Sequence, residues 1–265
     1  MCLRLRACTR SDGTVRQLDV GRREFVTLYA SDRHELSAFA LAPSGDTVWL
    51  GTNQGHLGAI DARSHAVAVP FAVRHARKAN TLSLDAAGRD WLLASASTDA
   101  SVRVWDVRRM GSKPLVQIDL PKASQAAEWA PDGSCRLAVT CFDDHLRIFD
   151  LSGAAKASGA GAPKAASAAA EAPSPKPLIK HVTQTGRWVV PFRTVWTAKA
   201  DGVIVGGMKR SAEVYDAHSG RRVASLRDEK MTAIPSRNAA HPNGSVLACA
   251  TNSGRVHLFD ASREH

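Results

Sequence analysis

Residues 92–108 read L-L-A-S-A-S-T-D-A-S-V-R-V-W-D-V-R and contain two strand patterns separated by a turn. The small and apolar residues 92–97 are typical of a buried strand. Residues 98–101 favour a turn, because Asp and Ser side chains hydrogen-bond to nearby backbone groups. From Val102 onward side chains alternate in kind with a period of about two residues, as expected of a second strand. The stretch therefore predicts a β-hairpin that ends in the pair Trp105-Asp106.

The ending of this hairpin recurs along the chain. A hydrophobic residue followed by Asp closes a strand-like stretch at Asp19, Asp61, Asp106, Asp150, Asp216 and Asp260. The intervals between these residues are 42, 45, 44, 66 and 44, and a propeller blade takes about 40 to 45 residues. A glycine turn and a further strand pattern precede five of the endings, with the glycines at Gly45, Gly88, Gly133, Gly202 and Gly244. Short strands at this spacing predict an all-β propeller of the WD40 type.

The repeat count predicts an N-terminally incomplete WD40 β-propeller. The chain has about five full blades plus a partial one, where a closed propeller of this type has about seven. Either the chain is an incomplete version of a longer protein, which we favour, or it closes with six blades. The longest interval contains residues 152–177, which are rich in Ala, Gly, Ser and Pro. We expect one domain over residues 1–265, with this insertion disordered because it cannot bury enough apolar surface.

The composition limits the classes of partner. The 265 residues carry a formal net charge of +10, which favours a polyanion such as nucleic acid. A basic surface without such a partner is the alternative. The five cysteines include no C-x-x-C pair, which argues against a disulfide framework or a zinc site and for the cytoplasm or nucleus. Apolar runs are too short to cross a bilayer and the first residues lack a signal-peptide core, so we expect no membrane association.

The side chains of His75, Ser95 and Asp99 could be mistaken for a catalytic triad. Together with Trp105 they have the spacing of a structural hydrogen-bonded set in a WD40 blade, and this is our interpretation. The chain contains no nucleophile elbow, phosphate-binding loop or zinc-protease motif. We therefore expect no enzyme activity, no cofactor and no metal.

Residues 181–196 read H-V-T-Q-T-G-R-W-V-V-P-F-R-T-V-W. Gly186-Arg187-Trp188 followed by Phe192 and Trp196 resembles the signature of the WD repeat-containing protein 76 and Changed Mutation Rate family. That family is related to the UV-damaged DNA-binding protein subunit 2. Residues 93–99, 112–115, 130–133, 140–144, 215–216 and 252–259 agree with the same family. The resemblance is good from residue 74 to residue 259 and weak before that.

This resemblance implies a nuclear propeller that binds DNA, prefers UV-damaged DNA and acts in DNA metabolism and the damage response. It also implies histones or chromatin as partners. In the UV-damage relative, a wedge on the loop that corresponds to Gly186-Arg187-Trp188 inserts at the lesion, and a DNA-contacting lysine corresponds to Lys78. The present sequence differs in the wedge itself, so lesion insertion of the same kind is not implied.

Several basic residues are expected on one face, because the loops between blades and the mid-blade hairpin turns of a propeller open on the same side. Guanidinium and ammonium groups there would bind phosphates, and an aromatic ring would offer a stacking surface. A solvated basic rim with Trp188 packed inward is the alternative. The predicted DNA contacts are Arg74, Arg77, Lys78, Gly186, Arg187, Trp188, Lys209 and Arg210.

The pair Trp105-Asp106 is followed by Val107-Arg108, which resembles the W-D-x-R box of substrate receptors for cullin-4 ubiquitin ligases. This second resemblance implies docking on the ligase adaptor, damage-specific DNA-binding protein 1, through Trp105, Asp106 and Arg108. The alternative, which we favour, is that Arg108 forms only a salt bridge within its own blade.

Overall fold

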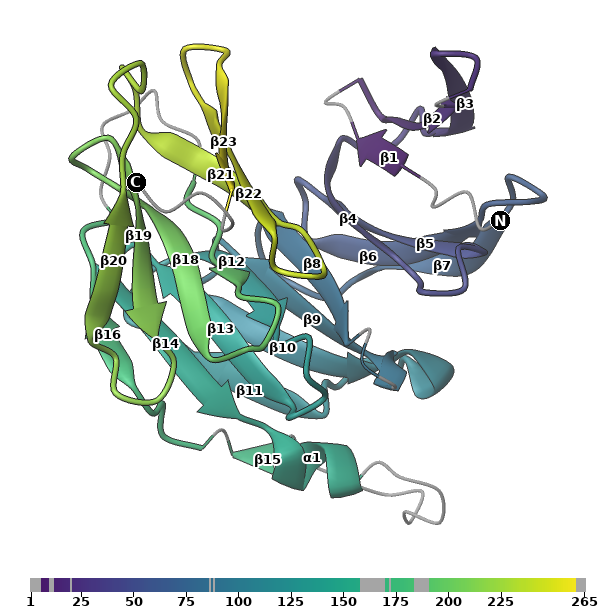
Figure 1. Cartoon of the computed structure of the whole chain (residues 1–265). Coiled ribbons are helices and arrows are strands. Elements are labelled where there is room, and N and C mark those ends of the chain that lie inside the picture. Colours follow the sequence, from purple (N-terminus) through teal and green to yellow (C-terminus); the bar gives the residue numbers. More distant parts are fainter. Residues whose placement is uncertain are drawn as a thin grey trace.

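The described residues form six β-sheets that follow one another in chain order around an arc, from the purple first sheet to the yellow last one (Figure 1). The computed structural model describes residues 6–9, 12–19, 21–85, 87, 89–157, 170–171, 173–183 and 191–260. Neighbouring strands within each sheet are antiparallel, apart from one short parallel addition to the third sheet. The predicted all-β WD40 propeller, with a sheet for each repeat found in the sequence, is confirmed.

The strands of each sheet follow one another along the chain. The first sheet contains β1 (Arg6–Thr9), β2 (Thr14–Asp19) and β3 (Glu24–Ala30), and the second contains β4 (Leu36–Leu41), β5 (Thr47–Thr52), β6 (His56–Asp61) and β7 (Val67–Val73). The third contains β8 (Ala79–Asp85), β9 (Arg89–Ser97), β10 (Ser101–Asp106) and β11 (Val116–Asp119), with the 3-10 helix η1 (Val107–Arg109) after β10. The fourth contains β12 (Ser124–Trp129), β13 (Arg136–Cys141), β14 (His145–Asp150) and β16 (Leu178–Lys180).

The last two sheets complete the arc. The fifth contains β17 (Val195–Trp196), β18 (Gly202–Gly207), β19 (Ser211–Asp216) and β20 (Arg222–Leu226), and the sixth contains β21 (Pro235–Ala240), β22 (Val246–Thr251) and β23 (Val256–Asp260). The first strands of neighbouring sheets contact one another, as β4 does β8 and β8 does β12, so these strands form the inner wall.

The hydrophobic core lies between neighbouring sheets rather than within any one of them. Leu93 and Trp105 of the third sheet pack with Trp49 and Leu57 of the second, and every further pair of neighbours shares a similar apolar cluster. Because a single sheet cannot bury its own faces, each repeat is stabilised by the next one along the chain. The described cysteines of the core, Cys135, Cys141 and Cys249, are buried free thiols.

The sixth sheet differs from the four sheets before it, because the described residues supply three strands instead of four. Val256 and Leu258 on β23 are 63% and 69% exposed, whereas Val102 and Val104 at the same places in β10 are 0% and 1% exposed. In the third sheet β11 pairs with β10 at those two valines. The exposure of the β23 side chains therefore follows from the uncovered edge of that strand.

The insertion expected at residues 152–177 has defined structure at both ends. Helix α1 (Ser152–Ala157) packs Ala155 into the apolar cluster of the third and fourth sheets, and β15 (Ala170–Glu171) pairs in parallel with β11. The backbone N–H of Lys176 donates to the Ile148 carbonyl at 2.7 Å. Residues 158–169 and 172 lie outside the described residues, so disorder there stays a prediction. No helix of the described residues is long and apolar enough to span a bilayer.

A buried set of hydrogen bonds joins the strands of the third sheet, as predicted from the spacing of its residues. The Ser95 hydroxyl lies 2.7 Å from His75 Nε2 and accepts from Trp105 Nε1 at 2.9 Å. His75 Nδ1 lies 3.0 Å from Asp99 Oδ2. His75, Ser95 and Trp105 are each no more than 1% exposed. With all partners buried inside the sheet, the set stabilises the fold.

We expect the variant Ser95→Ala to lower the free energy of unfolding by about 1–3 kcal/mol, because it leaves two buried nitrogens without their partner. Urea denaturation followed by tryptophan fluorescence measures this change. The matched control is Ser112→Ala at an exposed position, where we expect a change within about 0.5 kcal/mol. Equal unfolding midpoints for the two variants would show that the set does not stabilise the sheet.

Candidate nucleic-acid interface

One face of the propeller carries the linkers that join each sheet to the next. Since strands alternate in direction within a sheet, the turns between β5 and β6, β9 and β10, and β18 and β19 open on the same face as these linkers. We call it the linker face. The other turns, including the one that follows β10, open on the opposite face.

Hydrogen bonds tie the loops of the linker face to one another. The Asn53 N–H donates to the Glu35 carbonyl at 2.9 Å, and the Arg74 N–H donates to the Gly55 carbonyl at 3.0 Å. Gly55 has a φ of 82°, and a Cβ placed there would lie 2.3 Å from the His75 carbonyl oxygen. Glycine is therefore required where the β5–β6 turn meets the linker that precedes β8. This linker carries Arg77 and Lys78.

The structure places four of the predicted DNA contacts at exposed positions on the linker face. Arg77 and Lys78 are exposed on the linker before β8, and the Lys78 carbonyl accepts from the Thr98 N–H at 3.0 Å, which fixes the backbone. Lys209 and Arg210 are exposed on the turn between β18 and β19. Within the described ranges, none of these four side chains forms an ion pair.

Unlike the nearby Arg77 and Lys78, Arg74 packs its side chain against other residues of the fold. Its guanidinium carbon lies 5.7 Å from the centre of the Trp105 ring, and its Nη2 donates to the Met110 carbonyl at 3.4 Å. The side chain is half-buried between the second and third sheets. Arg74 therefore contributes to packing rather than to the exposed charge, although the sequence places it beside Arg77.

Other basic residues of the linker face were missed in the sequence. Lys122 stands two residues before the first residue of β12, as Arg77 does before β8 and His34 does before β4. The position two residues before the first residue of each inner strand was the sequence signal that could have identified Lys122. Lys230 and Arg255 are also exposed on this face, where Arg255 Nη1 donates to the Lys230 carbonyl at 3.1 Å.

Several carboxylates on the linker face have internal partners. Burial is the largest influence on Asp99 and alone would raise its pKa, but hydrogen bonds from His75 and Ser101 lower the pKa below its ordinary value. Asp143 pairs with Arg147, and Asp228 lies 2.8 Å from His257 Nδ1. These three carboxylates are therefore paired with groups of their own sheets. The exposed lysines and arginines of this face contribute positive charge to the local electrostatic potential.

Gly186, Arg187 and Trp188 lie outside the described residues and stay predicted contacts on the grounds of the sequence. The chain on both sides of them is anchored. His181 Nε2 lies 2.9 Å from the Gly206 carbonyl oxygen, the Thr183 hydroxyl donates to the Cys141 carbonyl at 2.7 Å, and Phe192 is fully buried. The linker that contains residues 184–190 therefore begins and ends at fixed points of the fourth and fifth sheets.

The W-D-x-R box lies on the opposite face. Arg108 donates from Nε and Nη2 to the two carboxylate oxygens of Asp106 at 2.9 and 2.7 Å. The guanidinium also lies over the Trp91 ring at 4.0 Å from its centre. This arrangement is the salt bridge within the blade that the sequence left as one alternative, and it raises the pKa of Arg108. The side chain nonetheless stays 43% exposed.

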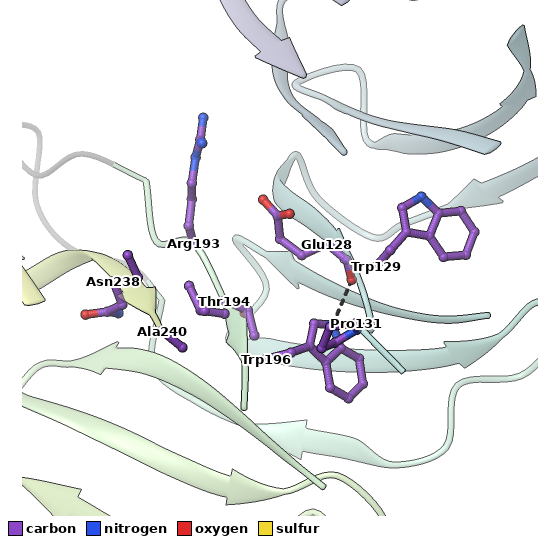
Figure 2. Close-up of a pocket in the computed structure, with 10 residues that line it drawn as sticks. Glu128, Trp129, Pro131, Arg193, Thr194, Trp196, Asn238 and Ala240 are labelled. Carbon is purple, nitrogen blue, oxygen red and sulfur yellow. Dashed lines mark hydrogen bonds between the residues drawn. The ribbon is translucent and has the colours of Figure 1, made fainter. Parts of the chain in front are cut away.

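A cavity of about 320 Å³ lies where the inner strands of the fourth, fifth and sixth sheets meet, lined by residues such as Glu128, Arg193 and Trp196 (Figure 2). Trp196 Nε1 donates to the Glu128 carbonyl at 2.9 Å. Burial raises the pKa of the Glu128 carboxyl, and Arg193 and Arg237 act against that shift. Burial and the charge of Arg193 lower the pKa of Arg237 to about 10. These charges belong to one partly buried cluster at the junction of three sheets.

The described part of the chain contains no group of three or more His, Cys, Asp and Glu side chains arranged to hold a metal ion. The lining of the cavity in Figure 2 includes one carboxyl group, that of Glu128. Acid–base catalysis by paired carboxylates needs two such groups close together. The lining of this cavity does not provide such a pair.

Comparison with known proteins agrees with the WD40 fold and identifies proteins that are similar in sequence to this chain. The WD domain, G-beta repeat family matches residues 75–106, the segment that contains the buried set of the third sheet. WD repeat-containing protein 76 of Mus musculus is 30% identical over 94% of this chain and 38% of its own length. The Xenopus laevis protein of the same name is also 30% identical, over 94% of this chain and 41% of its own length.

A fungal relative carries a more informative name. DNA damage-binding protein CMR1 of Phaeosphaeria nodorum is 28% identical over 94% of this chain and 49% of its own length. The chain thus spans between about two fifths and one half of these relatives, and neither name is that of an enzyme. As the stretch around Gly186-Arg187-Trp188 predicted, the chain is a WD40-repeat protein related to WD repeat-containing protein 76 and to the CMR1 proteins.

Proposed function

We propose that this protein binds DNA through its linker face, acts in the nucleus in DNA metabolism and the response to DNA damage, and prefers UV-damaged duplex. The observation that carries the proposal is the set of exposed cations on several loops of one face, Arg77, Lys78, Lys122, Lys209 and Arg210. The name of the fungal relatives, DNA damage-binding protein, supports the same function. Histones or chromatin remain a further predicted partner.

The chemistry of this face favours recognition of the DNA backbone. Lysine and arginine side chains neutralise phosphates and release counterions, which makes affinity strongly dependent on salt. The face presents loops, whose side chains can follow the shape of a duplex without reading base edges in the major groove. A lesion that bends or unstacks the duplex changes this shape, so preference for damaged DNA needs no base-specific contact.

We expect the double variant Arg77→Glu/Lys78→Glu to lose at least about tenfold in affinity for duplex DNA, because two phosphate contacts become repulsive. The slope of log affinity against log salt concentration should fall by about two. Fluorescence anisotropy at two salt concentrations, with untreated and UV-irradiated duplex, measures both quantities and the preference for damage. Equal affinity for the two duplexes would contradict the damage preference.

The matched control is Arg63→Glu/Arg109→Glu, which changes net charge by the same amount at exposed positions of the opposite face. We expect it to bind DNA nearly as the unmodified protein does. An equal loss of affinity in both double variants would show that net charge alone, and not the linker face, determines binding.

Docking on the cullin-4 ligase adaptor is a second candidate function. The observation that favours it is the position of Arg108. Its partly exposed guanidinium lies on the face opposite to the linker face, which is the proposed DNA-binding surface. A protein of this kind would hold DNA on one side and the adaptor on the other. Of the three predicted contacts, Arg108 is the accessible one. Trp105 is 1% exposed, so its prediction as a contact is wrong, and Asp106 is 7% exposed; these two residues position Arg108 and the blade instead.

We expect Arg108→Ala to abolish capture of the adaptor while it leaves DNA affinity unchanged. Loss of the ion pair with the buried Asp106 carboxylate should lower the free energy of unfolding by about 1–3 kcal/mol. Pull-down with purified adaptor measures capture, and Arg109→Ala at the neighbouring exposed position is the control. Equal recovery of the adaptor by Arg108→Ala and the unmodified protein would remove this second function.

A further inference from the structure

A groove of about 440 Å³ lies on the rim of the propeller, where the last strands of the first two sheets, β3 and β7, contribute to its lining. The lining includes Tyr29 of β3, Arg33 and His34 of the linker that follows β3, and Pro70 and Phe71 of β7. We call it the rim groove. Its lining combines aromatic rings and the exposed Arg33 guanidinium with the exposed carboxylate of Asp32. Aromatic rings beside a cation are the combination with which proteins bind single-stranded nucleic acids.

The second sheet departs from the repeat at this groove. The residue three before the closing Asp is Arg103, Arg147, Glu213 or His257 in the later sheets, and it is Gly58 in the second sheet. The pairing of β6 with β7 shifts between Leu57 and Ala59, so that Pro70 and Phe71 bulge out of register. The Phe71 ring lies over Gly58, where an added Cβ would meet it at 2.8 Å. Bulges of this kind redirect a side chain, and they are frequent next to functional sites.

The bulge brings Phe71 next to rings from other strands. Its centre lies 6.3 Å from that of Tyr29, with the two planes 17° apart, and 5.1 Å from that of His34. Tyr29, His34 and Phe71 all stay partly exposed. Burial, then the neighbouring His56 and Arg33, lower the pKa of His34, which favours an uncharged imidazole at neutral pH. The groove therefore offers flat, uncharged ring surfaces beside the exposed Arg33.

The rim groove is continuous with the linker face. The Glu35 carbonyl, next to His34, accepts from the Asn53 N–H, and the turn that begins at Asn53 contacts the linker of Arg77 through Gly55. His34 occupies the same position before β4 that Arg77 occupies before β8. A DNA strand held by the cations of the linker face would therefore pass the open end of the groove.

We propose that the rim groove binds an unpaired nucleobase of the DNA strand that lies on the linker face. The base stacks on the rings of Phe71 and Tyr29, and Arg33 contacts the adjacent phosphate. This inference rests on the proposed DNA binding and adds to it a site for bases that have left the duplex. Stacking on aromatic rings tolerates any base, so the groove selects unpaired structure rather than sequence.

The test compares a duplex that contains one unpaired nucleotide with a fully paired duplex of the same sequence, using the full chain and fluorescence anisotropy. We expect tighter binding of the first probe. Phe71→Leu and Tyr29→Leu keep apolar packing but remove a ring, and each should lose about tenfold in affinity for the unpaired probe. Each should lose less than about twofold for the paired probe, with an unchanged salt slope, because stacking involves no ion release.

The matched control is Phe25→Leu on β3, where the ring is 59% exposed away from the groove. It should bind both probes as the unmodified protein does. Equal binding of the two probes by the unmodified protein, or a loss in Phe71→Leu no larger than in Phe25→Leu, would overturn the inference and leave DNA binding intact. An equal loss on both probes would also overturn it. Failure of the unmodified protein to bind either probe would overturn the proposed function itself.

Discussion

The Ser95 hydroxyl connects two ends of the third sheet, because it contacts His75 on the linker before β8 and Trp105 near the far end of β10. The same linker continues from His75 to Arg77 and Lys78, so the buried set fixes the backbone that presents the exposed cations. The linker is also held by the Arg74 and His75 N–H groups, which donate to the Gly55 carbonyl, and by the Lys78 carbonyl, which accepts from the Thr98 N–H. Folding and the candidate interface therefore share the hydrogen bonds that hold this linker.

Other sheets contain comparable sets of side-chain hydrogen bonds that are built from different residues. In the fifth sheet His181 Nδ1 lies 3.0 Å from the Tyr215 hydroxyl, which donates to Glu213 Oε2 at 2.6 Å, and burial together with Glu213 raises the pKa of that tyrosine. In the sixth, His257 pairs with Asp228. These contacts give buried polar groups a partner, although the buried His257 Nε2 has none among the described residues, and an unsatisfied group costs stability. The second sheet has Gly58 at that place, and an aromatic side chain from β7 occupies the space.

The two faces of the propeller use their charges differently. On the linker face Asp99, Asp143 and Asp228 are engaged inside their sheets, while neighbouring lysines and arginines extend into solvent. On the opposite face Arg108 is paired with Asp106, and Arg136 with Asp132. The opposite face also exposes cations such as Arg63 and Arg109, so the two faces differ in how their acidic residues are paired rather than in the presence of positive charge. The net charge of the chain alone does not reveal this difference.

The sequence by itself determined the repeats, the strand–turn–strand pattern of each blade and the buried set of His75, Ser95, Asp99 and Trp105. These features follow from local periodicity, turn chemistry and spacing, which are properties of neighbouring residues. It also located Arg77 and Lys78 correctly on an exposed linker. Only the tertiary structure decided that Arg74 packs on Trp105 while Arg77 is exposed, and that Arg108 pairs within its blade. Only the tertiary structure brought Tyr29 and Phe71 together. The positions of Arg74 and of the two rings depend on strand register and on contacts between residues far apart in the chain, which no local pattern encodes. The pairing of Arg108 with the nearby Asp106 was one of two alternatives in the sequence, and the conformation of the folded side chain decided between them.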